Sequence, residues 1–349
     1  MRSKVFSRCL AFTLVVLAGQ AIGQDNSIKV YPPDDLYTKV TGNPRLGTLF
    51  ITGEITTDLA GEIAKIVEDL RLDGGSVVLN SPGGNLLAGI ELGQVIRSSG
   101  LSTNVGRDGG SPVDKLPGQC FSSCVMAYVG GLFRTLEEGS KLGVHRFSSE
   151  VKSDSDLDVA QILSAAITNH LTAMGVSSEL FERMVMASKD EIYVLGREES
   201  QSLNLVTGGS MIPEWSMEIV EGGYYLRGSQ DSWWGEGRNM LLCVDDNILL
   251  TTMYQAGANA STILESTVKH SLRVDGEFID LGNPLKWEVA GGSYVTGLFR
   301  LDAYLKMRIQ SSESFGHAAH PHNPEIFWGY TVETKGGKQM IRDFMSNCR

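Results

Sequence analysis

Serine hydroxyls that can do acyl-transfer chemistry lie within the short segment Cys120–Cys124. Ser122 and Ser123 stand at the expected start of a helix, directly after a Gly/Pro-rich loop. A serine oxygen there lies near the helix N-terminus, and the next amide can donate to an oxyanion. The same position is also the usual place for a serine that only caps the helix. The residues therefore predict either a nucleophile or a plain cap.

A histidine and a carboxylate that can serve such a serine follow later in the chain. His145 ends an apolar strand expected over 142–147, where it can act as a general base or be a structural histidine. Asp190 precedes the apolar run 192–195 and can orient a histidine, with Glu191 beside it as a rival. Surface charge is the simpler interpretation of both carboxylates.

The turn after an expected strand over 76–80 offers a place for developing negative charge. The chain there reads Ser81-Pro82-Gly83-Gly84, so proline sets the turn and two glycines let the backbone approach a ligand closely. A helix expected over 85–98 begins next, and its first amide hydrogens have no partner within the helix. Such amides can form an oxyanion hole, although most Pro-Gly-Gly turns are only structural.

In order and spacing, these segments resemble the proteolytic subunit of the Clp protease, within the Clp-protease/crotonase superfamily. Leu79–Gly84 matches the family's Asn-Ser-Pro-Gly-Gly turn, and Gly118-Gln119 matches the Gly-Gln that precedes its nucleophile. The resemblance covers residues 45–207 and implies Ser122 as the nucleophile. It implies His145, 23 residues later, as the base, and Asp190, 45 residues further, as the orienting carboxylate.

The same resemblance implies that the amides of Gly84 and Ser123 hold the oxyanion. Ser123 remains the rival nucleophile, since a shift of one residue exchanges the two serines. The chain departs from the family at Cys120, Phe121 and Cys124, where the family has small residues. In this respect it is similar to exported proteins of the superfamily that carry a Cys-x-Ser-x-Cys signature.

The elements that must position these residues alternate between strands and helices over residues 47–209, which predicts an α/β domain. The resemblance implies that this domain is ClpP/crotonase-like and is built from a ββα spiral. Residues 24–46 are expected to be a lead-in segment, and the long loop 106–117 a lid. Over 210–349, short aromatic and β-branched runs alternate with turn residues, which predicts a smaller β-rich domain.

The N-terminus has the form of a secretory signal peptide over residues 1–23. Arg2, Lys4 and Arg8 precede the apolar run 9–18, and Ala21-Ile22-Gly23 offers small residues for cleavage. An uncleaved anchor helix is the alternative. Past residue 25 no stretch approaches the length that spans a bilayer, so we expect a periplasmic or secreted protein with no further span. The net charge of −11 argues against a nucleic-acid partner.

Four cysteines remain after the signal peptide, and an even number in an oxidising compartment predicts two disulfides. Cys120–Cys124 and Cys243–Cys348 are preferred, because each pair then lies within one expected domain. The first pair is less secure, since side chains at i and i+4 of a helix are poorly aimed at each other.

These features predict an exported serine peptidase or acyl hydrolase that acts on a peptide or protein and needs no cofactor. The alternative is a catalytically silent module that binds a peptide or protein partner in the periplasm. Acyl-CoA chemistry is disfavoured by export, and a cysteine nucleophile by disulfide formation. Self-association is expected by analogy with the superfamily.

Two further clusters have simpler structural interpretations. His317, His320 and His322 lack the carboxylate or cysteine spacing of a metal site, so no metal is expected. Trp233-Trp234 with Tyr224-Tyr225 offers a platform for a carbohydrate or peptide, but such residues more often form the core or rim of a β domain.

Overall fold

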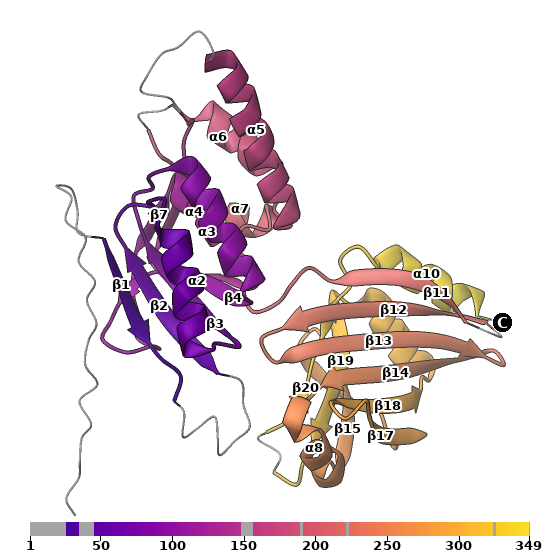
Figure 1. Ribbon diagram of the computed structural model, residues 1–349. Coiled ribbons are helices and arrows are strands. Elements are labelled where there is room, and N and C mark those ends of the chain that lie inside the picture. The colour runs from indigo at the N-terminus through magenta and orange to yellow at the C-terminus, as the bar shows by residue number, and fades with distance from the viewer. Residues whose placement is uncertain are drawn as a thin grey trace, which may run out of the picture. The chain divides into compact units, whose positions relative to one another are not determined.

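The computed structural model divides into two compact units, Met1–Val206 and Thr207–Arg349 (Figure 1). It describes residues 26–34, 45–147, 156–188, 191–220, 223–323 and 326–348. The expected signal peptide therefore lies outside the described residues. The described residues form a mixed α/β structure with several sheets, as the alternating pattern predicted.

The centre of unit 1 is a five-stranded sheet (Figure 1). Its strands, in order across the sheet, are β1 (Ser27–Tyr31), β2 (Leu46–Thr52), β3 (Gly74–Asn80), β4 (Leu101–Val105) and β8 (Arg134–Leu136). The strands from β2 to β8 are parallel, whereas β1 runs antiparallel to β2. Parallel neighbours require crossover connections, which here are helices.

Two of these crossovers are α2 (Leu59–Leu70) and α3 (Leu86–Ser98), the second of which corresponds to the helix expected over 85–98. Each buries its apolar face in the core of unit 1. Asn85 caps α3, because its side-chain oxygen accepts the amide hydrogen of Ala88 at 3.0 Å. The first turn of α3 therefore begins directly after Gly84.

A three-stranded sheet adjoins the carboxyl end of β3. It consists of β7 (Gln119–Phe121), β9 (Lys141–Val144) and β10 (Tyr193–Leu195). β7 and β9 are parallel, and β10 runs antiparallel to β9. A parallel bridge from Ser81 to Cys120 joins the chain leaving β3 to β7. The carboxyl ends of β7 and β9 therefore meet at one edge.

Unit 1 also contains the helices α5 (Asp156–Ala173), α6 (Glu179–Met186) and α7 (Arg197–Ser202). Ile167 of α5 and Leu180 of α6 are fully buried in the same core.

Two segments of unit 1 contain strands that were not expected from the sequence. The lead-in expected over 24–46 contains β1, because Ile28 packs against the core and the strand pairs with β2 along its length. A helix was expected from Cys120, but β7 continues to Phe121 and the helix α4 spans only Ser123–Tyr128.

Unit 2 is rich in β structure and has its own apolar core. An antiparallel six-stranded sheet contains, in order, β11 (Glu214–Val220), β12 (Gly223–Ser232), β13 (Gly235–Val244), β14 (Asn247–Gln255), β18 (Tyr294–Arg300) and β17 (Lys286–Ala290). A second sheet contains β16 (Glu277–Asp280), β15 (Lys269–Val274), β19 (Ser314–His320), β20 (Trp328–Gly329) and β21 (Val332–Glu333).

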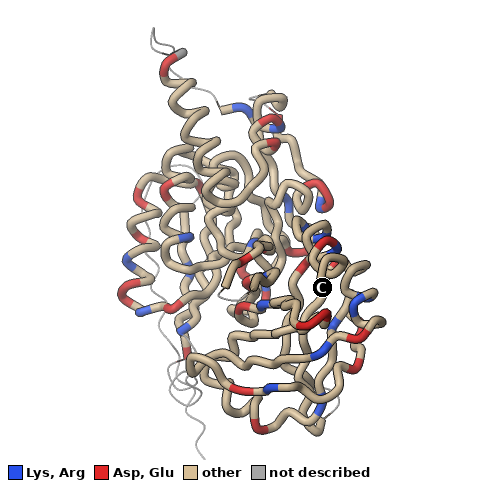
Figure 2. The backbone as a smooth tube through the Cα atoms, turned by 90° about the vertical axis from the view of Figure 1, so that its right-hand side faces the viewer, with Lys and Arg blue, Asp and Glu red and all other residues tan. Residues whose placement is uncertain are grey.

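The helical elements of unit 2 are η1 (Gly257–Asn259), α8 (Ala260–Ser266), α9 (Ala303–Ser311) and α10 (Lys338–Asn347). A disulfide between Cys243 and Cys348 joins β13 to the residue after α10, as preferred from the sequence. Basic and acidic residues are interspersed along the chain of both units (Figure 2). In the part of the chain that the structure describes, no helix combines the length and the apolar character needed to cross a bilayer.

Candidate active site

The ends of three neighbouring strand segments bring the Ser81–Gly84 turn, Ser122 and His145 near one another. The Ser81 amide donates to the Gln119 carbonyl at 2.7 Å, and the Phe121 amide donates to the Ser81 carbonyl at 3.1 Å. On the other side of β7, the Ser122 amide donates to the Gly143 carbonyl at 2.9 Å. The turn after β3, Ser122 after β7 and His145 after β9 therefore lie side by side.

Ser122 occupies the junction between β7 and α4 in a backbone conformation that is rare for a serine. Its φ is +56° and its ψ is −126°, and it stands at the N-cap of α4. Non-glycine residues at such angles cost on the order of 1–3 kcal/mol and persist only where the surroundings impose them. The side chain is half-buried, and its hydroxyl makes no hydrogen bond within the described residues, so it is available to react.

Ser123, the rival nucleophile, is the first residue of α4 and is only 2% exposed. Its hydroxyl oxygen is buried with no hydrogen-bond partner among the described residues. A Cβ placed on Gly89 of α3 would lie 2.3 Å from the Ser123 carbonyl oxygen, so α3 covers this residue closely. Burial therefore favours Ser122 as the reactive serine.

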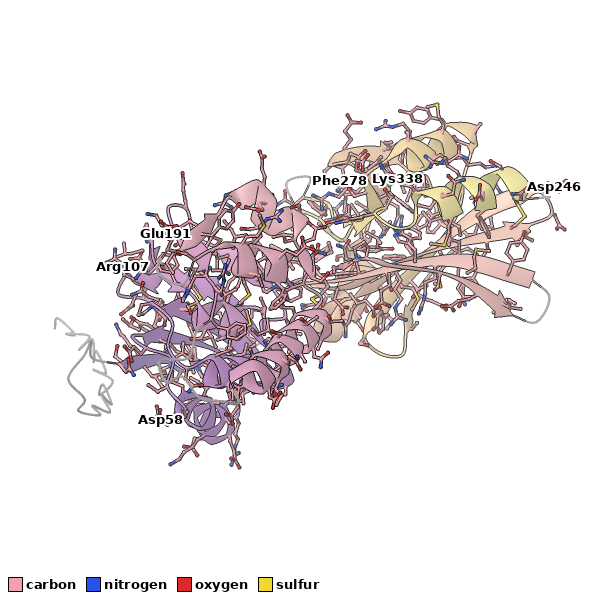
Figure 3. The ribbon with its side chains drawn as sticks, turned by 90° about the horizontal axis from the view of Figure 1, so that it is seen from above. Asp58, Arg107, Glu191, Asp246, Phe278 and Lys338 are labelled. Carbon is pink, nitrogen blue, oxygen red and sulfur yellow. A yellow bond between two sulfur atoms is a disulfide. The ribbon has the colours of Figure 1, made fainter. Side chains whose placement is uncertain are left out.

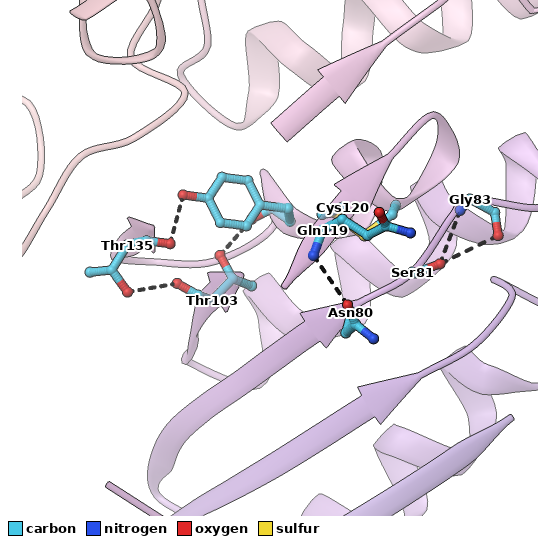
Figure 4. The surroundings of a disulfide bond; sticks show 9 residues. Asn80, Ser81, Gly83, Thr103, Gln119, Cys120 and Thr135 are labelled. Atoms are coloured by element: carbon cyan, nitrogen blue, oxygen red, sulfur yellow. Dashed lines mark hydrogen bonds between the residues drawn. A yellow bond between two sulfur atoms is a disulfide. The ribbon is translucent and has the colours of Figure 1, made fainter. Parts of the chain in front are cut away.

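The Pro-Gly-Gly turn is held by hydrogen bonds on both sides (Figure 4). The buried Ser81 hydroxyl accepts from the Gly83 amide at 3.1 Å and donates to the Gly83 carbonyl at 3.4 Å. The Ile55 amide also donates to that carbonyl, at 2.8 Å. Gly83 and Gly84 have φ of +110° and +150°, which only glycine adopts readily.

Two amides beside Ser122 have no acceptor among the described residues. Neither the Gly84 nor the Ser123 N–H donates in any hydrogen bond there, although the neighbouring Gly83 and Asn85 amides both do. The Ser123 amide also lies at the positive end of α4. A pair of unpaired N–H groups next to a free hydroxyl can bind an oxyanion.

His145 directly follows β9 and is half-buried. Its Nδ1 lies 3.0 Å from the Arg146 carbonyl oxygen, so Nδ1 carries the proton and donates to that oxygen. Nε2 then has a free lone pair, as a general base requires. No hydrogen bond joins His145 to Ser122 in the described residues. Catalytic hydrogen bonds are often long before substrate binds.

Asp190 lies outside the described residues, so the structure does not test its role. Glu191 is exposed at the surface of unit 1 (Figure 3). Next along the chain, Ile192 packs on β9, because a Cβ placed on Gly143 would lie 2.4 Å from its Cγ2. The chain entering β10 therefore runs past the strand end that carries His145.

A disulfide joins Cys120 to Cys124 across Ser122 (Figure 4). The sequence raised the concern that two cysteines in one helix are poorly aimed at each other. The concern does not apply, because Cys120 belongs to strand β7 and only Cys124 belongs to α4. The strand-to-helix turn brings their Cα atoms to 5.3 Å, within the usual range for a disulfide.

Two arginines that the sequence reading missed bind the carboxyl end of α4. Arg97 donates to the carbonyls of Gly130 at 2.8 Å and Gly131 at 2.9 Å. Arg134 is 2% exposed and donates to the Val129 carbonyl at 3.2 Å. Positive charge at this end of a helix is favourable. In a sequence, a single arginine inside an apolar segment does not indicate that its side chain will bind the end of a helix.

The segment 106–117, expected to be a lid, contains a hairpin of β5 (Arg107–Asp108) and β6 (Lys115–Leu116). Asp108 forms an ion pair with Lys29 of β1 and accepts a hydrogen bond from the Tyr31 hydroxyl at 2.8 Å. The base of the hairpin is therefore fixed to the main sheet.

The two clusters noted in unit 2 do not form the sites considered for them. Across the described ranges, no group of three or more His, Cys, Asp or Glu side chains is arranged to hold a metal ion. His317 is buried beside His270 instead. Tyr224 is the second residue of the ten-residue strand β12 and Trp233 comes directly after its last residue, so the length of the strand separates them.

Comparisons with known proteins give a likeness in fold to part of the chain. No protein-family model matches the chain, and no curated protein matches it. A mutant of the 1510-N membrane-bound stomatin-specific protease is 18% identical over 46% of this chain and 76% of that chain, with a TM-score of 0.35. A ClpP1 mutant from Listeria monocytogenes is 17% identical over 49% of this chain and 93% of that chain, with a TM-score of 0.36.

Proposed function

We propose that unit 1 is a serine hydrolase domain with a fold of the Clp-protease/crotonase type. The proposal depends chiefly on one observation: Ser122 presents a free, half-buried hydroxyl from a left-handed turn, next to the unpaired amides of Gly84 and Ser123. A helix cap alone does not require this conformation, and the Ser122 side chain makes no capping hydrogen bond.

In the proposed reaction, His145 Nε2 takes the proton from the Ser122 hydroxyl as its oxygen attacks a carbonyl carbon. The Gly84 and Ser123 amides stabilise the oxyanion of the tetrahedral intermediate. The protonated His145 then gives its proton to the leaving group, and an acyl-enzyme remains. Water, activated by His145, releases the acyl group. Asp190 is proposed to replace the Arg146 carbonyl as the acceptor of the His145 Nδ1–H, and so to hold the imidazole in the required tautomer.

We propose a peptide or protein as the substrate class and a periplasmic or secreted location. Two disulfides within the described residues support this location, because such bonds persist in oxidising compartments. The signal peptide proposed over residues 1–23 gives the route of export.

A fluorophosphonate probe tests this function, because it reacts only with serines that are activated as nucleophiles. The mature, oxidised protein is treated with the probe, and the modified residue is located by mass spectrometry. Wild type is expected to be labelled at Ser122, and labelling is expected to disappear in Ser122→Ala and His145→Ala. Ser123→Ala is the matched control and is expected to retain labelling.

Labelling at Ser123 would shift the nucleophile by one residue and overturn the assignment. An absence of labelling in wild type would favour the catalytically silent module. Binding of peptides by unit 1 would then be the property to measure.

A further inference from the structure

The Cys120–Cys124 disulfide lies at a position from which it can control Ser122. Cys120 belongs to the last strand before the serine, and Cys124 to the first turn of the helix after it. Both cysteines are fully buried, at 0% exposure. The disulfide therefore closes a ring of five residues with Ser122 at its centre, inside the core of unit 1.

Apart from the disulfide, different contacts hold the strand before Ser122 and the helix after it. On the strand side, β7 is hydrogen-bonded to Ser81 on one edge and to Gly143 on the other. On the helix side, α4 has only six residues, too few to be stable by its own hydrogen bonds. Helix α3 packs closely on Ser123, His170 Nε2 donates to the Met126 carbonyl in the middle of α4, and Arg97 and Arg134 bind its far end. The disulfide is the covalent link at its near end.

The orientation of the first turn of α4 determines where the Ser123 amide points, and this amide belongs to the proposed oxyanion site. Ser123 is the first residue of α4, and its amide points along the helix axis, away from the body of the helix. A small rotation of α4 about the Ser122 junction would turn this amide away from the Gly84 amide. Such a rotation would also let Ser122 relax from its φ of +56°.

We propose that the Cys120–Cys124 disulfide positions the nucleophile: it locks α4 against β7, so that Ser122 keeps its left-handed conformation and the Ser123 amide keeps its direction. The inference rests on the proposed function. Cys120 and Cys124 act through Ser122 and Ser123, so they are positioning residues and do not react themselves.

The test compares two double variants, each lacking one disulfide. Cys120→Ala/Cys124→Ala removes the link at Ser122, and Cys243→Ala/Cys348→Ala removes the link in unit 2. For each, the fluorophosphonate reaction gives a maximal labelling rate and a half-saturating probe concentration. Hydrogen–deuterium exchange of the peptide 119–128 reports the conformation around Ser122 without depending on activity.

For Cys120→Ala/Cys124→Ala we expect the maximal labelling rate to fall about tenfold or more, since misplacement by about 1 Å can cost 100-fold. The half-saturating concentration should change less than about twofold, because probe binding is not the step affected. Exchange should rise in 119–128 and stay unchanged in the other strands of unit 1. Cys243→Ala/Cys348→Ala should leave labelling and the exchange of 119–128 as in wild type.

The other possible results also support or overturn the proposal. Equal labelling rates in wild type and Cys120→Ala/Cys124→Ala would overturn the positioning role and leave the proposed function intact. If wild type is not labelled, the proposed function fails, and exchange in 119–128 alone decides whether the disulfide holds Ser122. If both the Ala variant and Cys120→Ser/Cys124→Ser lose the helical signal of unit 1, the disulfide serves global stability and the proposal is wrong.

Discussion

Gly83 leaves no room for a side chain beside Ser122. A Cβ placed on Gly83 would lie 2.7 Å from the Ser122 Cβ and 3.3 Å from its hydroxyl oxygen. It would also lie 2.9 Å from the Phe121 carbonyl oxygen. The turn after β3 and the Ser122 turn after β7 are thus packed closely against each other.

Gly83→Ala is therefore expected to reduce labelling of Ser122 by about 100-fold, because the new methyl group would displace the serine or the turn. The φ of +110° at Gly83 adds strain to any other residue there. Gly61→Ala is the matched control, since a Cβ at Gly61 in α2 meets nothing within 4 Å. It should leave the labelling rate unchanged and stabilise α2 slightly. Equal labelling rates in Gly83→Ala and Gly61→Ala would contradict the close packing of Gly83 against Ser122.

Ser123→Ala is expected to raise the stability of unit 1 while labelling continues at Ser122. The Ser123 hydroxyl is buried without a hydrogen-bond partner among the described residues, so its removal relieves a desolvation cost of about 1 kcal/mol. Urea unfolding, followed by far-ultraviolet circular dichroism, measures the change. A loss of stability would show that the hydroxyl has a partner, and a loss of labelling would restore Ser123 as the nucleophile candidate.

The local sequence predicted the parts of the site that depend on turns. Ser81-Pro82-Gly83-Gly84 has the residues that a sharp strand-to-helix turn requires, and the structure forms that turn. His145 was expected at the end of a strand and directly follows β9. These features depend on residues near one another in the chain, so periodicity and turn chemistry are enough to find them.

Other parts depend on contacts that are distant in sequence. The run from Cys120 to Gly130 is uniformly small or apolar, and periodicity cannot show that its first residues pair with β9 as a strand. The same dependence on distant residues applies to β1, whose short alternating sequence Ser27–Tyr31 is a strand of the main sheet through pairing with β2, which lies further along the chain.

Arg134 also makes contacts that are distant in sequence. Removal of its side chain is expected to destabilise unit 1 strongly. Besides the Val129 and Gly131 carbonyls, its guanidinium donates to the carbonyls of Met174 at 3.1 Å, Asn204 at 2.6 Å and Leu205 at 3.0 Å. Burial lowers the pKa of Arg134 to about 10, so the group stays charged at neutral pH. Arg134→Met leaves these buried carbonyls without their donor, and the free energy of unfolding should fall by about 3 kcal/mol or more.

Arg107→Met is the control for this prediction. Arg107 donates to a single carbonyl, that of Pro117, at an exposed position of unit 1 (Figure 3). The change in its free energy of unfolding should stay within about 0.5 kcal/mol. Urea unfolding of both variants is compared with wild type, and a loss below about 1 kcal/mol for Arg134→Met would contradict the structural role.

The stability of unit 2 should depend on pH through His270 and His317. Nδ1 of His270 lies 3.1 Å from Nε2 of His317, and both rings contact Trp287. Burial, together with the charge of His320, lowers the pKa of His270 to about 4. Burial, together with the charges of His270 and His320, lowers the pKa of His317 to about 3.

Both folded-state pKa values are below the value of 6.5 for an unfolded histidine. Above pH 6.5 the two states bind the same number of protons at these groups, so stability does not change through them. As pH falls from 6.5 toward 4, only the unfolded chain takes up the protons. The free energy of unfolding should then decrease by about 1.4 kcal/mol per pH unit for each histidine.

All five tryptophans lie in unit 2, so their fluorescence during urea unfolding reports on this unit alone. We expect wild type to lose stability between pH 6.5 and pH 4.5, and His270→Gln to lose it with a smaller slope. The variant keeps a side chain that can hydrogen-bond to His317 but does not titrate, so the carboxylates contribute equally to both slopes. Identical slopes would show that His270 takes up its proton as readily in the folded chain as in the unfolded one.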